Sequence, residues 1–277
     1  MGEDQGKPVR YALVTGASAG IGAAFARALA ARGTHVVLTA RRAERIEALA
    51  RELRERHGVD ARAIPADLAD PVAPAALQAA IDAQGLAIDV LINSAGYGVT
   101  GSLVAQDWRT HAAFLRVMIE APTELCHRFV PGMRERGYGR IVNVASFAGL
   151  MPAPAGHTLY AASKAYLSRF SEALALENRH HGINVCALCP GFTLSEFHDV
   201  TGSRKTVSKM PKWVWLDAGD VARDGLDAVE RGRIVRIVGV RYRLIKALFK
   251  LIPDPLALKL IAAYSGNFRV TERHAKH

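Results

Sequence analysis

Residues 11–31 read YALVTGASAGIGAAFARALAA and place a short strand, a glycine-rich turn and a helix in direct succession. Tyr11–Thr15 is short and apolar, and the helix from Ala23 to Ala31 turns Phe25 and Leu29 inward. A turn of this kind allows a phosphate to approach the backbone, and it points N–H groups and the helix dipole at the anion. Three glycines at this spacing also occur by chance, but their place between the first strand and first helix predicts a dinucleotide site. The predicted site contains Thr15, Gly16, Ser18, Gly20, Ile21 and Gly22.

Strands and helices alternate along the rest of the chain. This pattern predicts an α/β fold, a Rossmann-type doubly wound parallel sheet with helices on both faces. We find no repeat and no interdomain linker, so residues 1–240 are expected to form a single domain, with 241–277 as a helical extension. The further predicted strands are His35–Ala40, Ala61–Ala66, Asp89–Ile92, Arg140–Ala145, Ile183–Leu188 and Ile234–Val240, and predicted helices include Ala43–His57, Pro74–Ala83 and Gln106–Arg136 with a bend near Pro122.

Two arginines, Arg41 and Arg42, stand at the end of the second predicted strand, where such a unit reads the adenosine ribose. An acidic residue there would accept a hydrogen bond from a 2′-hydroxyl, whereas guanidinium groups suit a 2′-phosphate. The pair could instead belong to a solvated helix start, because further arginines follow. Cations at a helix N-terminus oppose the helix dipole, however, so the pair favours NADP(H) over NAD(H).

The segment NVASFAGLMPAPAGHTLYAASK, residues 143–164, joins a strand end, a loop and a new helix. Tyr160 and Lys164 are four residues apart and share one helix face, and Ser146 lies at the carboxyl end of the strand. A cation on that face would favour the phenolate, and the serine hydroxyl could donate to a carbonyl oxygen. Taken alone, the spacing also suits an ordinary helix with a solvated lysine. Together with the glycine turn, it predicts a proton-transfer site.

The formal net charge of the 277 residues is +10, and it is unevenly distributed. Residues 203–277 hold 16 Lys and Arg against 7 Asp and Glu, so the first 202 residues are nearly neutral and we expect no nucleic-acid binding. The sequence shows neither an apolar run of 18 residues nor a secretory signal. Cys186 and Cys189 lie three apart on a predicted strand and face opposite ways, so we expect no metal site and a reducing, cytoplasmic location.

The combined motifs resemble the classical short-chain dehydrogenase/reductase family, in the family's order and spacing across about residues 9–240. The matching pieces are Thr15-Gly16-x-x-x-Gly20-Ile21-Gly22, Asp67, Asn93-Ser94-Ala95-Gly96, Ser146, Tyr160-x-x-x-Lys164 and Pro190-Gly191.

The resemblance implies a role for each matching residue. Tyr160 would be the general acid/base, Ser146 would polarise the carbonyl, and Lys164 would bind the nicotinamide ribose and lower the pKa of the tyrosine. Asp67 would contact the adenine, and Thr193 would lie near the carboxamide. The other residues expected to bind the cofactor, NADP(H), are Leu68, Asn93, Ala95, Gly96, Pro190 and Gly191.

One position departs from the family pattern. The family usually carries an Asn in the helix before the serine strand, and registering Ala121-Pro122 on that pattern places Met118 there. A thioether cannot supply the hydrogen bonds of an amide. If the proton relay uses the backbone carbonyl at this position, activity is expected to survive.

Residues 192–216 are predicted to form a substrate lid, as long segments after Pro190 do in this fold. Its large side chains either line an apolar pocket or pack the lid onto the body, and an apolar or aromatic ketone or secondary alcohol is favoured over a sugar. His157 is expected either to touch substrate or to lie exposed in a loop. The candidate pocket residues are Phe147, Leu150, Met151, Phe192, Phe197, Met210, Trp213 and Trp215.

Residues 241–264 combine basic and apolar side chains, and Leu244, Leu248 and Leu251 share a helix face. We interpret this segment as a helix that closes the cleft or contacts another subunit, or alternatively as a weak contact with an anionic membrane surface.

The sequence therefore predicts an NADP(H)-dependent oxidoreductase that transfers a hydride between the nicotinamide and a hydrophobic ketone/secondary alcohol pair. One alternative is a non-catalytic NADP(H)-binding sensor or scaffold, which Met118 supports. Another is a peripheral lipid-surface protein on the same fold. A homodimer or homotetramer is expected from the family resemblance.

Overall fold

Parallel strands form one sheet in the computed structural model, which describes residues 10–99, 101–194 and 211–265. The strand order is β3-β2-β1-β4-β5-β6-β7, so the direction of winding reverses between β1 and β4. This arrangement confirms the predicted doubly wound α/β fold, and it opens a crevice at the carboxyl ends of those strands. The strands are β1 (Tyr11–Thr15), β2 (His35–Thr39), β3 (Ala61–Ala63), β4 (Ile88–Asn93), β5 (Gly139–Val144), β6 (Ile183–Cys189) and β7 (Val235–Ile237).

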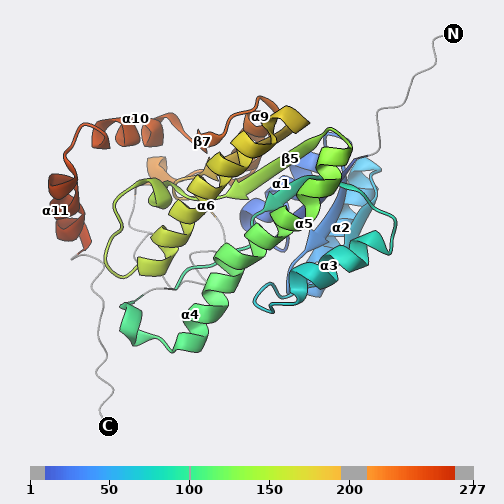
Figure 1. Cartoon of the computed structure of the whole chain (residues 1–277), viewed down its shortest axis with the longest axis horizontal. Coiled ribbons are helices and arrows are strands. Elements are labelled where there is room, and N and C mark those ends of the chain that lie inside the picture. Colours follow the sequence, from blue (N-terminus) through green and yellow to red (C-terminus); the bar gives the residue numbers. More distant parts are fainter. Residues whose placement is uncertain (1–9, 100, 195–210, 266–277) are drawn as a thin grey trace.

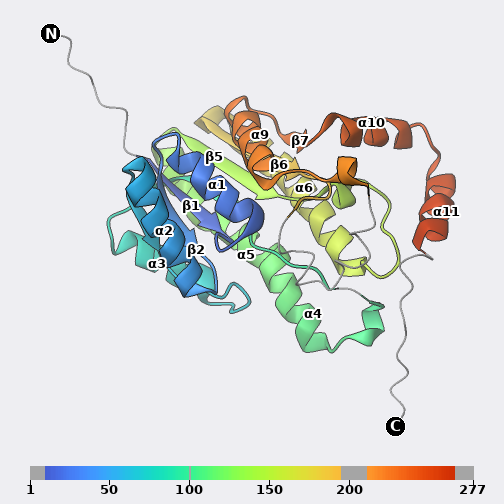
Figure 2. The same ribbon diagram turned by 180° about the vertical axis from the view of Figure 1, so that it is seen from behind.

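Helices cover both faces of the sheet. Figure 1 shows the face covered by α3, α5 and α6, and Figure 2 shows the opposite face, covered by α1, α2 and α9. Each face has its own apolar core, because the buried strand residues point alternately to the two sides. The helices are α1 (Gly20–Ala30), α2 (Ala43–His57), α3 (Ala73–Asp82), α4 (Trp108–Leu115), α5 (Ala121–Glu135), α6 (Thr158–Asn178), α9 (Ala218–Glu230), α10 (Val240–Phe249) and α11 (Asp254–Ser265).

The strand predictions for the third and last strands were too long. β3 ends at Ala63, two residues before Pro65, which has no N–H to continue the ladder. β7 covers only Val235–Ile237, and Gly239, with φ of 86°, turns the chain directly into α10.

The long helix predicted over 106–136 is interrupted at the bend expected near Pro122. α4 is followed by a π-helical turn, Arg116–Glu120, and only then by α5. The N–H of Ala121 donates to the carbonyl of Arg116, five residues back. An uninterrupted α-helix would need residue 122 to donate to the carbonyl of Met118, and Pro122 has no N–H to do so.

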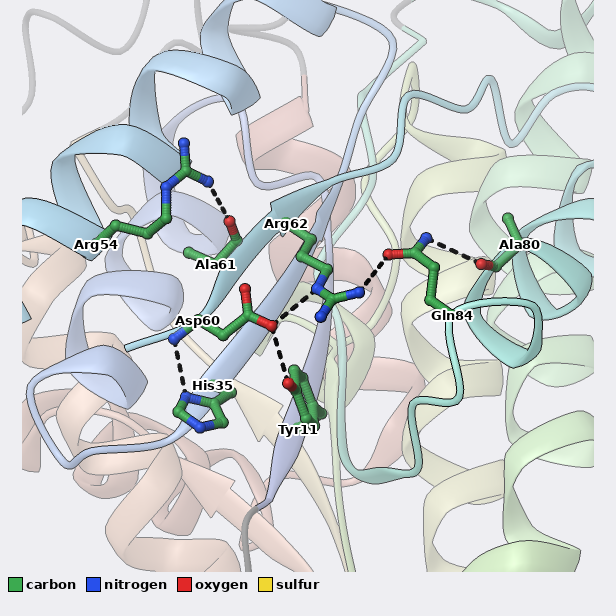
Figure 3. A network of polar contacts seen from close by, with 8 residues as sticks. All are labelled: Tyr11, His35, Arg54, Asp60, Ala61, Arg62, Ala80 and Gln84. Carbon is green, nitrogen blue, oxygen red and sulfur yellow. Dashed lines mark hydrogen bonds and ion pairs between the residues drawn. The ribbon is translucent and has the colours of Figure 1, made fainter. Parts of the chain in front are cut away.

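A polar network ties the amino-terminal ends of β1, β2 and β3 together (Figure 3). The Tyr11 hydroxyl and Arg62 Nε both donate to Asp60 Oδ2 at 2.8 Å, and the Asp60 N–H donates to His35 Nδ1 at 2.9 Å. Arg62 also donates to Gln84 Oε1 at 2.8 Å. Burial alone would raise the pKa of Asp60, but these hydrogen bonds outweigh it and hold the pKa below its usual value. This network stabilises the sheet edge opposite the crevice.

Candidate active site

The glycine turn after β1 brings two backbones closer than any side chain allows. Gly16 has a φ of 68°, and a Cβ on it would lie 2.8 Å from Cα of Ala95. A Cβ on Gly22 would lie 2.4 Å from the carbonyl oxygen of Gly16. The N-cap of α1, Ala19, offers no side chain to the first N–H groups of the helix. Those N–H groups are therefore available to an anion such as a pyrophosphate.

The crevice is an elongated cavity of about 810 Å³, within the range of ligand sites in proteins. It runs from Arg41, Arg42 and Asp67, past the glycine turn, to Ser146, Tyr160 and Lys164. All but two of the predicted site residues line it: Gly16, Ser18, Gly20, Ile21, Gly22, Arg41, Arg42, Asp67, Leu68, Ala95, Gly96, Ser146, Tyr160, Lys164, Pro190, Gly191 and Thr193.

The remaining two, Thr15 and Asn93, lie behind the cavity wall. The Thr15 hydroxyl accepts from the N–H groups of Ser94 and Ala95, both at 3.0 Å, and thereby fixes the end of β4 against β1. The Asn93 amide is buried and donates to Asn143 Oδ1 at 2.8 Å on the neighbouring strand. Their side chains position the strand ends rather than face the cavity.

The cavity end beside β2 carries the two predicted arginines. Arg42 donates to Ser18 Oγ from Nη2 at 3.0 Å, which links the glycine turn to the start of α2. Arg41 lines the same end. The Asp67 carboxylate accepts the N–H of Ala69 at 3.0 Å. The guanidinium groups of Arg41 and Arg42 therefore lie at this end of the cavity, near the glycine turn.

Ser146, Tyr160 and Lys164 lie together at the other end of the cavity. Ser146 follows β5, and its Oγ accepts the N–H of Ala148 at 3.1 Å. Tyr160 and Lys164 come from the first turns of α6, and the Lys164 ammonium lies 5.8 Å from the centroid of the Tyr160 ring. Lys164 Nζ donates to the carbonyl of Val144 at 2.7 Å, which holds the cation at the end of β5.

Burial shifts the pKa values of Tyr160 and Lys164. It raises the pKa of Tyr160 above its usual value, and the hydrogen bond with Ser146 lowers it only in part. Burial also lowers the pKa of Lys164 to about 8. The lowering contribution comes from Ser146 and not from Lys164, so the expected effect of Lys164 on the tyrosine pKa stays a prediction. Near pH 7 the phenol is neutral, a proton donor rather than a base, beside a lysine that is still mostly cationic.

Met118 belongs to the π-helical turn, is buried and lines the cavity. A Cβ placed on Gly96 would meet the Met118 Sδ at 3.0 Å and the Lys164 Nζ at 3.9 Å. The thioether and the lysine ammonium therefore both lie close to Gly96 on the cavity wall. The predicted departure from the family pattern therefore lies next to Lys164.

The predicted pocket residues separate into groups. Phe147, Met151 and Phe192 line the cavity, and so does His157. Trp215 lies against Phe192, with ring centroids 5.9 Å apart. Trp213 is exposed, and Leu150 does not belong to the cavity lining. Phe197 and Met210 lie outside the described residues, as does most of the predicted lid 192–216.

Two cavity residues come from the C-terminal segment, for which a helix closing the cleft was one of the expectations, but neither residue was among the predicted site residues. Tyr242 of α10 and Ile261 of α11 both line the cavity. The Tyr242 hydroxyl accepts the N–H of Phe192 at 3.0 Å and donates to the carbonyl of Val214 at 2.7 Å. A lone tyrosine in a basic, apolar segment carries no sequence signal for this role.

Fold and site together define a Rossmann-type oxidoreductase, in which a nucleotide crevice meets a serine, a tyrosine and a lysine. The family model described as short chain dehydrogenase matches residues 10–205. The chain belongs to the short-chain dehydrogenase/reductase family.

Individual relatives support the same family assignment. Nodulation protein G of Rhizobium sp. strain N33 is 40% identical over 195 residues, which cover 69% of this chain and 76% of that protein. A short-chain dehydrogenase from Sphingobium yanoikuyae, solved in complex with NADPH, superposes with a TM-score of 0.77 and 32% identity, covering 88% of this chain and 97% of that one. A bulky-bulky ketone specific alcohol dehydrogenase from Comamonas testosteroni superposes with a TM-score of 0.73 and 30% identity, covering 90% and 96%.

Proposed function

We propose that this protein is an NADP(H)-dependent oxidoreductase that interconverts bulky, apolar ketones and secondary alcohols, with Tyr160 as the general acid/base. The observation that carries the proposal is the meeting of Ser146, Tyr160 and Lys164 at one end of a cavity whose other end holds the glycine turn and two arginines.

The proposed chemistry follows from the protonation of these groups. The nicotinamide supplies or receives the hydride when it is bound. In reduction, the Ser146 hydroxyl donates a hydrogen bond to the carbonyl oxygen, and the neutral Tyr160 phenol transfers its proton to that oxygen as negative charge develops there. The neighbouring Lys164 ammonium stabilises the resulting phenolate, which recovers a proton from solvent. In oxidation the phenolate accepts the alcohol proton.

The preference for NADP(H) is supported by Arg41 and Arg42 beside the expected ribose position. Guanidinium groups bind a phosphate with several donors, and the cavity lining at this end offers Asp67 as a carboxylate already bonded to a main-chain N–H. The NADPH complex of the Sphingobium relative agrees with this choice.

The apolar substrate is supported by large apolar side chains in the cavity lining. Among them are Val117, Met118, Met151, Phe192 and Ile261. Such a wall offers few partners to the hydroxyls of a sugar and buries apolar groups on both sides of a carbonyl. The ketone specificity of the Comamonas relative is consistent with this substrate class.

The experiment is a titration with NADPH and NADH, followed by turnover of a ketone panel measured at the nicotinamide absorbance. We expect tighter NADPH binding, and we expect R41A/R42A to lose at least about tenfold in NADPH affinity with little change for NADH. R51A, which removes an exposed arginine of α2, the helix that begins just after Arg42, is the matched control. Equal loss for both cofactors would contradict the assigned role of the arginines. NADPH binding without turnover of any ketone or alcohol would favour the sensor alternative.

A further inference from the structure

The C-terminal helices α10 and α11 expose an apolar surface. They lie at one end of the molecule in both views, distant from α2 and α3 (Figures 1 and 2). Leu244 and Leu248 of α10, and Leu251 just beyond its end, recur at helical spacing and expose 61%, 62% and 80% of their area. On α11, three further leucines, Leu256, Leu258 and Leu260, are each about half exposed or more. Such a run of leucines in water indicates a binding surface.

Basic residues lie among these leucines in the sequence. Residues 240–265 contain five Lys and Arg and one acidic residue, Asp254. Lys250 and Lys259 are exposed beside the leucines. Lys246 turns inward and donates to the carbonyl of Leu150. The surface therefore pairs exposed leucines with net positive charge, which complements an anionic lipid headgroup layer.

An exposed tryptophan adjoins the same surface. Trp213 is 61% exposed, and the Arg241 guanidinium at the start of α10 lies 5.9 Å from its ring centroid. Tryptophan side by side with arginine is the pairing that suits the boundary between headgroups and acyl chains.

We propose that α10 and α11, with Trp213, dock onto the surface of an anionic lipid bilayer. A second copy of this chain fits the surface less well, because a twofold contact would oppose the cations of one copy to those of the other. No helix in residues 10–99, 101–194 or 211–265 is long and apolar enough to cross a bilayer. The contact is therefore peripheral, with the helices lying in the interface.

The inner sides of α10 and α11 contact the rest of the protein. Tyr242 is buried against the cavity, and Ile261 lines it. A docked bilayer would consequently lie beside the cavity. The binding inference itself does not rest on the proposed reaction. Removing the segment would also remove Tyr242, so point variants of the full chain give the cleaner test.

The experiment is flotation of the full chain with vesicles of phosphatidylcholine and phosphatidylglycerol, compared with phosphatidylcholine alone. We expect binding to the anionic vesicles and at least about a tenfold loss in the variant L244S/L248S/L251S. The variant K250E/K259E should lose on the order of fivefold per charge, and only with the anionic vesicles. L176S, which changes an equally exposed leucine on α6, should bind as the native chain does.

Thermal unfolding of each variant reports whether its fold is intact, and the lysine variant keeps the test decisive if the leucine variant misfolds. Failure of the native chain to float with anionic vesicles would overturn the proposal. Unchanged flotation of both variants would do so as well. If the leucine variant dissociates a native oligomer, the surface is a self-interface and the proposal is likewise overturned.

Discussion

The aromatic ring of Tyr242 lies directly on the backbone of Gly191. A Cβ on Gly191 would fall 1.9 Å from Cζ of the ring, and the ring centroid is 5.0 Å from that of Phe147. With its hydroxyl bonded to main-chain groups of Phe192 and Val214, Tyr242 forms part of the cavity wall. A residue of the C-terminal segment thus completes the wall beside the predicted nicotinamide position.

The first prediction concerns this contact. G191A should destabilise the protein by about 1–3 kcal/mol and weaken NADPH binding, because the new methyl group must displace the ring. The double variant G191A/Y242L removes the obstructing ring. Its loss of stability and of NADPH affinity should therefore be smaller than the sum of the losses in G191A and in Y242L. Thermal unfolding and NADPH titration of the three variants form a double-mutant cycle. Additive losses would show that the ring and the glycine do not interact.

The pH dependence of reduction should follow Lys164. Its folded-state pKa of about 8 lies below the usual lysine value, so the ammonium is present below that pH and is lost as the pH rises through it. Tyr160, with a raised pKa, stays protonated over the same range. We expect kcat/KM for the ketone to fall above pH about 8. In K164R, whose guanidinium stays charged, this fall should disappear whatever activity remains. If kcat/KM of K164R falls at the same pH, a group other than Lys164 controls the pH dependence.

Met118 offers a test of the proton relay. Pro122 cannot bond the main-chain carbonyl of Met118 in α-helical fashion, so a backbone acceptor at that position does not depend on the side chain. We expect M118N to change kcat by less than about tenfold, well below the usual contribution of a general acid or base. The buried amide should also lower the unfolding temperature. A gain in kcat of about a hundredfold would instead show that the amide is the missing relay group.

The Asp60 network should stabilise the fold without affecting the site. D60N should cost about 1–2 kcal/mol in urea unfolding, because the charge-assisted bonds from Tyr11 and Arg62 weaken. The carboxylate's pKa is held below its usual value, so its contribution is present above the unfolded-state pKa and is lost as the pH falls through the folded one. The difference between D60N and the native protein should therefore shrink in acid. D82N, at an exposed position in α3, is the control.

Much of the fold followed from local patterns. The apolar strand patterns and amphipathic helix patterns predicted the alternating elements. Gly16 and Gly22 lie where two backbones approach so closely that no side chain fits. Tyr160 and Lys164 share a face because helical geometry alone places residues four apart together. Their meeting with Ser146 and the glycine turn follows from parallel strands, whose carboxyl ends lie at one edge.

Other features depend on contacts between distant segments. The side to which Asn93 points is decided by its partner Asn143 on β5, and a strand sequence buried on both faces does not reveal it. The bend near Pro122 was expected, but its π-helical form was not. Tyr242 and Ile261 reach the cavity only because α10 and α11 fold back to it, and no local periodicity encodes that path. The net rise in the Tyr160 pKa is likewise a consequence of burial.

The most direct test of the proposed reaction is single-turnover reduction of a bulky aryl ketone by the NADPH-loaded Y160F variant, with Y166F, a change at a half-exposed tyrosine of the same helix, as control. We predict that Y160F binds NADPH as the native protein does but reduces the ketone at least about a hundredfold more slowly, whereas Y166F keeps native rates. Native-like reduction by Y160F would contradict the assignment of Tyr160 as the proton donor.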